Sequence, residues 1–337
     1  MKRKLSFLRT RILLPLAMVA ALGVGVGVPA ASAQARSASS AAQSSCSLDP
    51  PPPAGFTEQK VKVNGIGINY VRGGHGPTLL LLHGYPESWY EWDGILPALA
   101  EHYTVVAPDL PGAGDSDAPA DEADYTKKAM AADVYGLMVK LGLSHNVRVV
   151  GHDIGTMVAY AYAAAHPHDV AKLVLSEAPI PDSSIYSYAA LTANGPGLWW
   201  FGLFNDPGTL AYDLMKGKEK VWVTESIPVL EVVKNSISQC ELALYTHNLE
   251  KPGHLQATID WFSTLPQDVK NTTVAGKAKL TMPVLAIGGS ASLGSSVPDQ
   301  VRRYATNVTG VVIPDTGHWL YEERPATLTS LLLKFMK

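Results

Sequence analysis

The chain has 337 residues, of which 47% are hydrophobic and 17% are charged, and its 27 basic and 30 acidic residues give a formal net charge of -3. This composition excludes an intrinsically disordered chain, which needs low hydrophobicity and high net charge. The lack of a basic excess disfavours an electrostatic nucleic-acid binder. With 2 cysteines, 29 glycines and 24 prolines, the chain is neither a disulfide scaffold nor a fibrous protein.

The first predicted element is an export signal over residues 1–33. A basic stretch precedes an apolar run over residues 12–28, and the segment ends in Ala31-Ser32-Ala33, the small residues that a signal peptidase requires. A membrane-spanning helix needs about 20 apolar residues, and this run is shorter and contains Pro15. We therefore expect cleavage and a secreted or otherwise exported protein, with no stable membrane anchor after cleavage, rather than an uncleaved anchor.

Residues 34–55 have the composition of a flexible linker, since they are rich in Ala, Ser and Gln and contain a run of prolines. The linker contains Cys46, and Cys240 is the only other cysteine. An exported protein could join the two, but so wide a separation in sequence is a weak indication of a disulfide. A free, buried Cys240 is at least as good an interpretation.

The body of the chain alternates short apolar runs with helix-length segments. A hairpin with an Asn-Gly turn is predicted over residues 61–71. Buried strands are predicted at 78–82, 104–107, 147–150, 172–175, 284–287 and 310–313, and helices at 129–141 and 155–166. This alternation predicts an α/β fold with a mostly parallel sheet flanked by helices.

The alternation is interrupted between residues 180 and 262 by a segment of aromatic and helical character. The segment holds four of the seven tryptophans, namely Trp199, Trp200, Trp222 and Trp261. An insertion after the sixth strand would cover the carboxyl ends of the strands, where open α/β sheets bind their ligands. We predict a core over residues 56–179 and 266–337, with a helical cap over residues 180–265.

The strongest chemical signal is a Gly-x-Asp-x-Gly turn at residues 151–155, between a predicted strand and an apolar helix. The pattern is that of a nucleophile elbow with Asp153 in the place of serine. The backbone N–H of Ile154 would lie at the helix start, where it can stabilise an oxyanion. The alternative is an ordinary aspartate in a loop or at a helix N-cap.

A second turn, His83-Gly84-Tyr85-Pro86, directly follows the strand predicted at 78–82. In this position the backbone N–H of Tyr85 can point toward the same oxyanion, and His83 is a candidate substrate contact. The alternative is a generic turn after a strand.

A third signal is Asp315-Thr316-Gly317-His318-Trp319, which follows the last predicted strand. The order of catalytic groups in hydrolases of this type is nucleophile, acid and histidine, which favours His318 as the base. His152 is the competing histidine. Because adjacent residues on an elbow point apart, we interpret His152 as structural.

Four ordered motifs resemble those of the α/β-hydrolase family, and within it the epoxide hydrolase and haloalkane dehalogenase branch. They are HGYPESWYEW, DLPGAGDSD, GHDIGT and DTGHWLYEERP. The resemblance covers about residues 56–337 and implies an α/β-hydrolase core with an inserted helical cap. It also implies an aspartate that attacks an electrophilic carbon, and a histidine that activates water to hydrolyse the resulting ester.

The acid partner of His318 has two candidates. Many relatives place it after the seventh strand, but the corresponding loop at residues 288–294 contains no carboxylate, and Asp299 follows it less favourably. Some relatives place the acid at the end of strand six, and the segment SEAPIPD around Glu177 resembles that variant. We prefer Glu177 to Asp299.

The leaving group needs hydrogen-bond donors from the cap. Relatives that open epoxides usually supply two tyrosines, or a histidine and a tyrosine, but by resemblance Trp200 and Phe262 occupy these positions. Trp199 and Trp200 could hold an epoxide oxygen through their N–H groups while water supplies the proton, could hold a halide, or could be cap core. Trp261 and Phe262 are further candidate substrate contacts.

Epoxide hydrolysis is the expected function. Haloalkane dehalogenases typically carry Trp after the nucleophile, and fluoroacetate dehalogenases carry Arg, whereas Ile154 suggests a neutral, fairly apolar small-molecule substrate. The alternatives are a dehalogenase of the same fold and a non-catalytic hydrolase-like binding protein. The sequence shows no metal-ligand spacing and no phosphate loop, so we expect no metal and no cofactor. It leaves the oligomeric state open.

Overall fold

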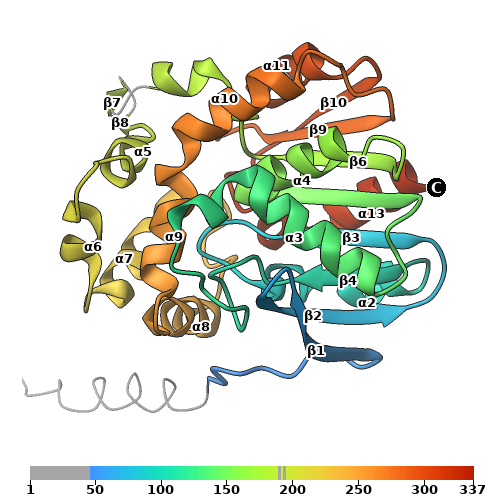
Figure 1. Ribbon diagram of the computed structural model, residues 1–337. Coiled ribbons are helices and arrows are strands. Elements are labelled where there is room, and N and C mark those ends of the chain that lie inside the picture. The colour runs from blue at the N-terminus through green and yellow to red at the C-terminus, as the bar shows by residue number, and fades with distance from the viewer. Residues whose placement is uncertain (1–45, 189–190, 193–194) are drawn as a thin grey trace, which may run out of the picture. The chain divides into compact units, whose positions relative to one another are not determined.

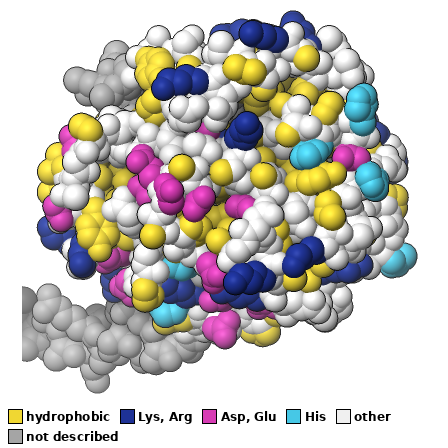
Figure 2. Space-filling view, in the orientation of Figure 1, with side chains coloured by type: hydrophobic (Ala, Val, Ile, Leu, Met, Phe, Trp, Pro, Cys, Tyr) yellow, Lys and Arg dark blue, Asp and Glu magenta, His cyan; other side chains and the backbone are white. Residues whose placement is uncertain are grey.

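The computed structural model describes residues 46–188, 191–192 and 195–337. The predicted export signal and most of the predicted linker lie outside these residues. Within the described ranges, no helix is long and apolar enough to cross a lipid bilayer. The face drawn in Figure 2 mixes acidic, basic and apolar side chains.

Eight strands form one sheet in the order β1-β2-β4-β3-β5-β6-β9-β10. Their bounds are β1 Phe56–Val63, β2 Ile66–Gly74, β3 Thr78–Leu82, β4 Thr104–Pro108, β5 Val147–His152, β6 Val170–Ser176, β9 Val284–Gly289 and β10 Val308–Ile313. β2 is antiparallel to β1 and to β4, and the other neighbours are parallel. The predicted hairpin and strands are confirmed, although β1 begins at Phe56 rather than at residue 61. The strand predicted at 310–313 is not fully buried, because β10 lies at the edge of the sheet and of residues 310–313 only Ile313 is buried.

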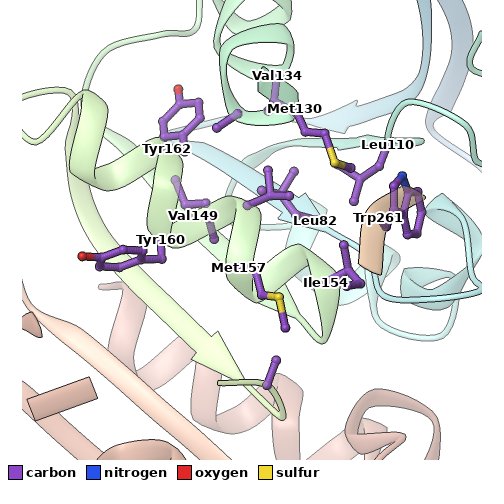
Figure 3. Close-up of a cluster of buried hydrophobic side chains, with 14 of the residues drawn as sticks. Leu82, Leu110, Met130, Val134, Val149, Ile154, Met157, Tyr160, Tyr162 and Trp261 are labelled. Carbon is purple, nitrogen blue, oxygen red and sulfur yellow. The ribbon is translucent and has the colours of Figure 1, made fainter. Parts of the chain in front are cut away.

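Successive side chains of β3 pack into the hydrophobic clusters on opposite faces of the sheet. Leu79 and Leu81 belong to the buried cluster on one face, and Leu80 and Leu82 to the cluster on the other. Successive side chains of a strand point to opposite faces, so a strand covered on both sides must be apolar throughout. Figure 3 shows Leu82 on the face that packs against α4.

Core helices cover the two faces of the sheet (Figure 1). The helices α3 Lys127–Lys140, α4 Ile154–Ala165 and α11 Ser296–Tyr304 contribute to one cluster, and α2 Leu96–Ala100, α12 Leu320–Glu323 and α13 Pro325–Met336 contribute to the other. The predicted helices at 129–141 and 155–166 correspond to α3 and α4. Two faces covered by helices are the requirement of a mostly parallel sheet.

The chain between β6 and β9 forms a group of mainly helical elements, and Figure 1 shows α5 to α9 gathered at one end of the sheet. The bounds are β7 Leu191–Thr192, β8 Gly195–Pro196, α5 Trp199–Phe204, α6 Leu210–Met215, α7 Glu219–Ser226, α8 Gln239–Glu250, α9 His254–Ser263 and α10 Leu265–Ala275. We call α5 to α9 the cap helices.

A disulfide joins Cys46 to Cys240, with 5.1 Å between the Cα atoms. Cys46 precedes β1, and Cys240 lies in the first turn of α8. The sequence alone leaves this pairing open, because a separation of 194 residues carries no information about proximity. The structure contains the bond, and Leu48 and Leu244, which follow the two cysteines in sequence, line the same small hollow.

A fully buried ion pair connects α3 with the base of the cap helices. Lys127 Nζ lies 3.1 Å from Asp268 Oδ2 in α10, and both side chains are 2% exposed. The backbone N–H of Lys127 donates to Asp268 Oδ1, and its Nζ also donates to the carbonyl of Trp261 in α9. Buried charges persist when they are paired and hydrogen-bonded, so this pair fixes α9 and α10 against the core.

Candidate active site

Asp153 occupies a sharp turn between β5 and α4, with backbone angles φ 44° and ψ -121°. Two glycines make the turn possible. A Cβ on Gly155 would lie 2.0 Å from the Leu82 carbonyl oxygen, and one on Gly151 would lie 2.3 Å from the Gly155 carbonyl oxygen. A non-glycine residue seldom adopts a positive φ, so the backbone of Asp153 is strained. The close packing of β5 and β3 against α4 holds it in this conformation. This is the geometry of a nucleophile elbow.

The carboxylate of Asp153 accepts a hydrogen bond from the turn that follows β3. The backbone N–H of Tyr85 donates to Asp153 Oδ2 at 3.0 Å. Ile154 is the first residue of α4, a position whose backbone N–H has no acceptor within the helix. The two residues predicted to form an oxyanion hole therefore lie on the two chain segments next to this carboxylate.

His318 lies beside Glu177. Glu177 Oε2 is 3.3 Å from His318 Nδ1, and Glu177 Oε1 accepts the backbone N–H of Gly289 at 2.6 Å. Glu177 is 1% exposed, so its contact with His318 is shielded from solvent. A histidine whose Nδ1 faces a carboxylate keeps Nε2 free to accept a proton from water.

The other predicted acid does not reach His318. Asp299 lies in α11, its side chain is 65% exposed, and it pairs with Arg302 at 2.7 Å. The structure thus brings Glu177 and His318 together and leaves Asp299 at the surface.

These groups open onto a cavity of about 220 Å³ that lies between the sheet and the cap helices. The core contributes Tyr85, Asp153, Glu177 and His318 to its lining. Aromatic side chains make up much of the rest, namely Trp199, Trp200, Phe201, Trp222, Phe262 and Trp319. A mostly apolar pocket with a few convergent polar groups is the usual form of a small-molecule site.

Two of the predicted substrate contacts do not line this cavity. His83 is fully buried, its Nδ1 donates to the Gly84 carbonyl, and its Nε2 accepts from the Leu110 N–H. Burial lowers the pKa of His83 to about 4, so it is a neutral structural group. Trp261 is also fully buried, and its indole N–H donates to the Pro111 carbonyl at 3.0 Å. Figure 3 shows Trp261 beside Leu110, within the hydrophobic core.

Trp222 lines the cavity although the sequence does not separate it from the other tryptophans of the insertion. It comes from α7, and it packs with 5.7 Å between ring centroids against Trp199. The tryptophan content of residues 180–262 is the signal that could have suggested it.

A buried acidic cluster lies behind His318. His152 Nε2 donates to the carbonyl of His318 at 2.9 Å, and its Nδ1 lies 3.0 Å from Glu91 Oε1 and 3.6 Å from Glu87 Oε2. All three side chains are buried. Burial would lower the pKa of His152, but the carboxylates of Glu91 and Glu87 raise it well above its ordinary value. His152 thus supports the backbone of His318, in agreement with its interpretation as structural.

The carboxyls of this cluster do not all ionise. Burial, followed by the charge of Glu91, raises the pKa of Glu87 to about 8, and burial together with Glu87 raises that of Glu322 well above its usual range. Glu87, Glu91 and His152 also bring three potential metal ligand atoms within 4.8 Å of one another. The 3.0 Å approach of Glu91 to His152 fits an ion pair with neighbouring protonated carboxyls, and we interpret the cluster in this way.

Comparison with known proteins places these features in context. Residues 77–325 match the family model described as the α/β hydrolase fold. The chain is 33% identical over 293 residues to the soluble epoxide hydrolase of Corynebacterium sp. (strain C12), a match that covers 83% of this chain and 96% of that protein.

Two solved structures give the same picture. The epoxide hydrolase CorEH without ligand superposes with a TM-score of 0.75 and 31% identity, over 83% of this chain and 98% of that chain. The Cif epoxide hydrolase from Acinetobacter nosocomialis superposes with a TM-score of 0.80 and 25% identity, over 85% of this chain and 90% of that chain.

Proposed function

Because the chain belongs to the α/β-hydrolase fold family, and to its epoxide hydrolase branch, we propose that this hydrolase opens a neutral, largely apolar epoxide to a diol through an ester on Asp153. The observation that carries the proposal is the convergence of Asp153 and the Glu177–His318 pair on one apolar cavity. A binding protein without turnover would not need this arrangement.

In the first step, an oxygen of Asp153 attacks a ring carbon and the carbon–oxygen bond of the epoxide breaks. Asp153 is suited to this role because the elbow exposes it at the carboxyl end of β5. The hydrogen bond from the Tyr85 N–H to Oδ2 orients the carboxylate, and a held geometry lowers the entropic part of the barrier.

In the second step, His318 removes a proton from water, and the resulting hydroxide attacks the carboxyl carbon of the Asp153 ester. Glu177 holds the ring of His318 through Nδ1 and stabilises the imidazolium that forms. The backbone N–H groups of Tyr85 and Ile154 would stabilise the oxyanion of the tetrahedral intermediate. Collapse of that intermediate releases the diol and regenerates the carboxylate.

The lining of the cavity supports a neutral substrate. None of the described residues that line it is Lys or Arg, so a carboxylate or phosphate on the substrate would find no cationic partner there. Ile154 follows the nucleophile and is fully buried. Apolar contacts with the aromatic side chains would therefore supply most of the binding energy.

Ester trapping tests the proposal. His318→Gln should accumulate an adduct with the mass of one epoxide when it is exposed to styrene oxide, cyclohexene oxide or a linear 1,2-epoxide. Peptide mapping should locate the adduct on Asp153, and the double variant with Asp153→Ser should form none. In a single turnover of the unaltered enzyme in ¹⁸O water, the label should enter Asp153 and not the diol. Label in the first diol released would contradict a covalent mechanism.

A dehalogenase with the same nucleophile is the second candidate. The indole groups of Trp199, Trp200 and Trp222 line the cavity, and an indole N–H can donate to a halide, which needs no proton. Halide release from short haloalkanes, without diol formation from any of the epoxides, would favour this candidate over epoxide hydrolysis.

Export forms a further part of the proposal. The Cys46–Cys240 disulfide supports it, because structural disulfides form and persist mainly in oxidising compartments. Fractionation of cells that express the full chain, followed by mass analysis of the N-terminus, tests it. Intact residues 1–33 on a protein confined to the cytosolic fraction would contradict export and cleavage.

A further inference from the structure

Opening an epoxide leaves an alkoxide that needs a hydrogen-bond donor and a proton. The positions where related enzymes would supply them hold Trp200 and Phe262. A phenyl ring has no donor, and an indole N–H donates a hydrogen bond but is not a proton source near neutral pH. The proposed function therefore requires a different acid in the cavity.

The hydroxyl of Tyr85 has the properties of such an acid. The side chain lines the cavity together with Asp153, and its hydroxyl is buried without a hydrogen-bond partner among the described residues. The ring is held in place by edge-to-face packing against Phe262 and Phe204, at centroid distances of 5.2 and 6.0 Å. Buried polar groups of native proteins are nearly always hydrogen-bonded, so a hydroxyl left unpaired in a cavity wall indicates a ligand atom at this point.

Trp222 supplies a second donor of the same kind. Its indole N–H is also buried without a partner among the described residues, and the residue lines the same cavity. Burial raises the pKa of Tyr85, the neighbouring Trp222 side chain acts against that rise, and the charge of Asp153 adds to it. The indole N–H and the phenol oxygen are therefore neighbours in the wall of the cavity.

We propose, on the basis of the epoxide hydrolysis argued above, that the Tyr85 hydroxyl and the Trp222 N–H bind the ring oxygen of the epoxide and that Tyr85 gives it its proton. Tyr85 then acts at both ends of the reaction, since its backbone N–H binds Asp153 while its side chain binds the leaving oxygen. The hydroxyl that is missing at Phe262 is present on the ring packed against it.

The protons balance over one turnover. As Asp153 attacks, the ring carbon–oxygen bond breaks, and its electron pair takes the proton of Tyr85 to give an alcohol and a phenolate. The N–H of Trp222 stabilises that phenolate. When His318 later removes a proton from water, the imidazolium returns it through solvent to the phenolate. One water is consumed for each diol, and Tyr85, His318 and Asp153 end as they began.

The rate of ester formation tests this assignment, measured as single-turnover adduct growth in the His318→Gln background. Tyr85→Phe removes only the hydroxyl and should slow ester formation by about 10²–10⁴-fold, the usual contribution of a general acid. Trp222→Phe should slow it by about 10²–10³-fold, as loss of a donor to a developing oxyanion does. Saturating epoxide should restore neither rate.

Tyr162→Phe is the matched control. Tyr162 also carries a buried hydroxyl without a partner among the described residues, but it lies on α4 within the core cluster of Figure 3. It should leave ester formation unchanged. The melting temperatures of the variants should stay close to that of the parent, which separates loss of chemistry from loss of fold.

A rate in Tyr85→Phe within a factor of about two of the parent would overturn the assignment of Tyr85 while leaving ester chemistry intact. A loss of affinity alone, with the rate recovered at saturation, would reduce Tyr85 to a binding contact and would also overturn it. Absence of any adduct in the His318→Gln parent with all the epoxides would instead refute the proposed function, and the donor pair with it.

Discussion

Glu177 and His318 lie 141 residues apart in sequence, yet Oε2 of the first is 3.3 Å from Nδ1 of the second. The second carboxylate oxygen of Glu177 is held by the Gly289 N–H at the end of β9. Glu177 is thus fixed between the ends of the neighbouring strands β6 and β9, with one oxygen facing the imidazole of His318.

Glu177→Gln tests the acid. The substitution keeps the size of the side chain and removes its charge, so His318 loses the group that stabilises its imidazolium. Hydrolysis of the ester should slow by about 10²–10⁴-fold. The covalent adduct should therefore become detectable in Glu177→Gln even though His318 is unchanged. Stopped-flow kinetics and intact-mass measurements check this.

Asp299→Asn is the matched control, because it removes a carboxylate that is exposed and paired with Arg302. It should change the rate of ester hydrolysis by less than about twofold, as a surface substitution away from the site. Adduct accumulation in Asp299→Asn, with normal turnover in Glu177→Gln, would reverse the assignment.

Gly155→Ala should strongly destabilise the protein. The added Cβ would lie 2.0 Å from the Leu82 carbonyl oxygen, and relief requires separating α4 from β3. We expect a loss of about 1–3 kcal/mol in the free energy of unfolding, or more. Gly202→Ala in α5 is the control, since its Cβ meets nothing within 4 Å and a helical Gly→Ala change gains about 0.5–1 kcal/mol. Chemical denaturation that gave equal values for the two variants would contradict the tight elbow.

Glu87→Gln should change how stability depends on pH. The pKa of Glu87 is raised to about 8, above the value near 4.5 of an unfolded glutamate, so its protonated form stabilises the native state. That stabilisation is complete below pH 4.5 and is lost as the pH rises through 8. Glutamine cannot ionise, so the variant should gain stability relative to wild type as the pH rises from about 4.5 to about 8, by up to about 1.4 kcal/mol per pH unit, and the difference should level off above that.

Urea denaturation at pH 5, 7 and 9 measures this difference. The free energies of unfolding of the two proteins should differ most at pH 9. Curves that stay parallel over the whole range would mean that Glu87 is ionised in the native protein at neutral pH.

Asp268→Asn should cost about 3–5 kcal/mol, because it leaves the charge of Lys127 buried without a counter-charge. The combined change Lys127→Met and Asp268→Leu should recover much of that loss, since it removes both buried charges. Arg302→Gln breaks an exposed ion pair and should cost no more than about 1 kcal/mol. Thermal and urea unfolding compare the variants. A cost for Asp268→Asn as small as that for Arg302→Gln would contradict an ion pair between Lys127 and Asp268 that is shielded from water.

The sheet could be predicted because buried strands are apolar on both faces. The short apolar run Thr78–Leu82 predicts a buried strand, and it forms β3 over the same residues. The elbow was also visible, since its glycines and its aspartate are adjacent in sequence. The preference for Glu177 rests on the resemblance of its segment to relatives that carry the acid at the end of strand six, and the structure puts Glu177 beside His318.

Features that depend on the direction of a side chain could not be predicted. His83 and Trp261 lie in the expected segments, but their rings point into the core. The cluster of Glu87, Glu91 and His152 joins segments that only the folded sheet brings together. Two unpaired donors on Tyr85 and Trp222 emerge only when the cap helices are packed over the cavity.

The Cys46–Cys240 bond has a consequence for the cap helices. The chain of the cap helices leaves the core after β6 and returns before β9, and the contacts of Lys127 hold α9 near the second of these crossings. The disulfide anchors α8 to the chain segment preceding β1, a third fixed point. The bond therefore restrains α8 more than the helices α5, α6 and α7, to which no disulfide is attached among the described residues.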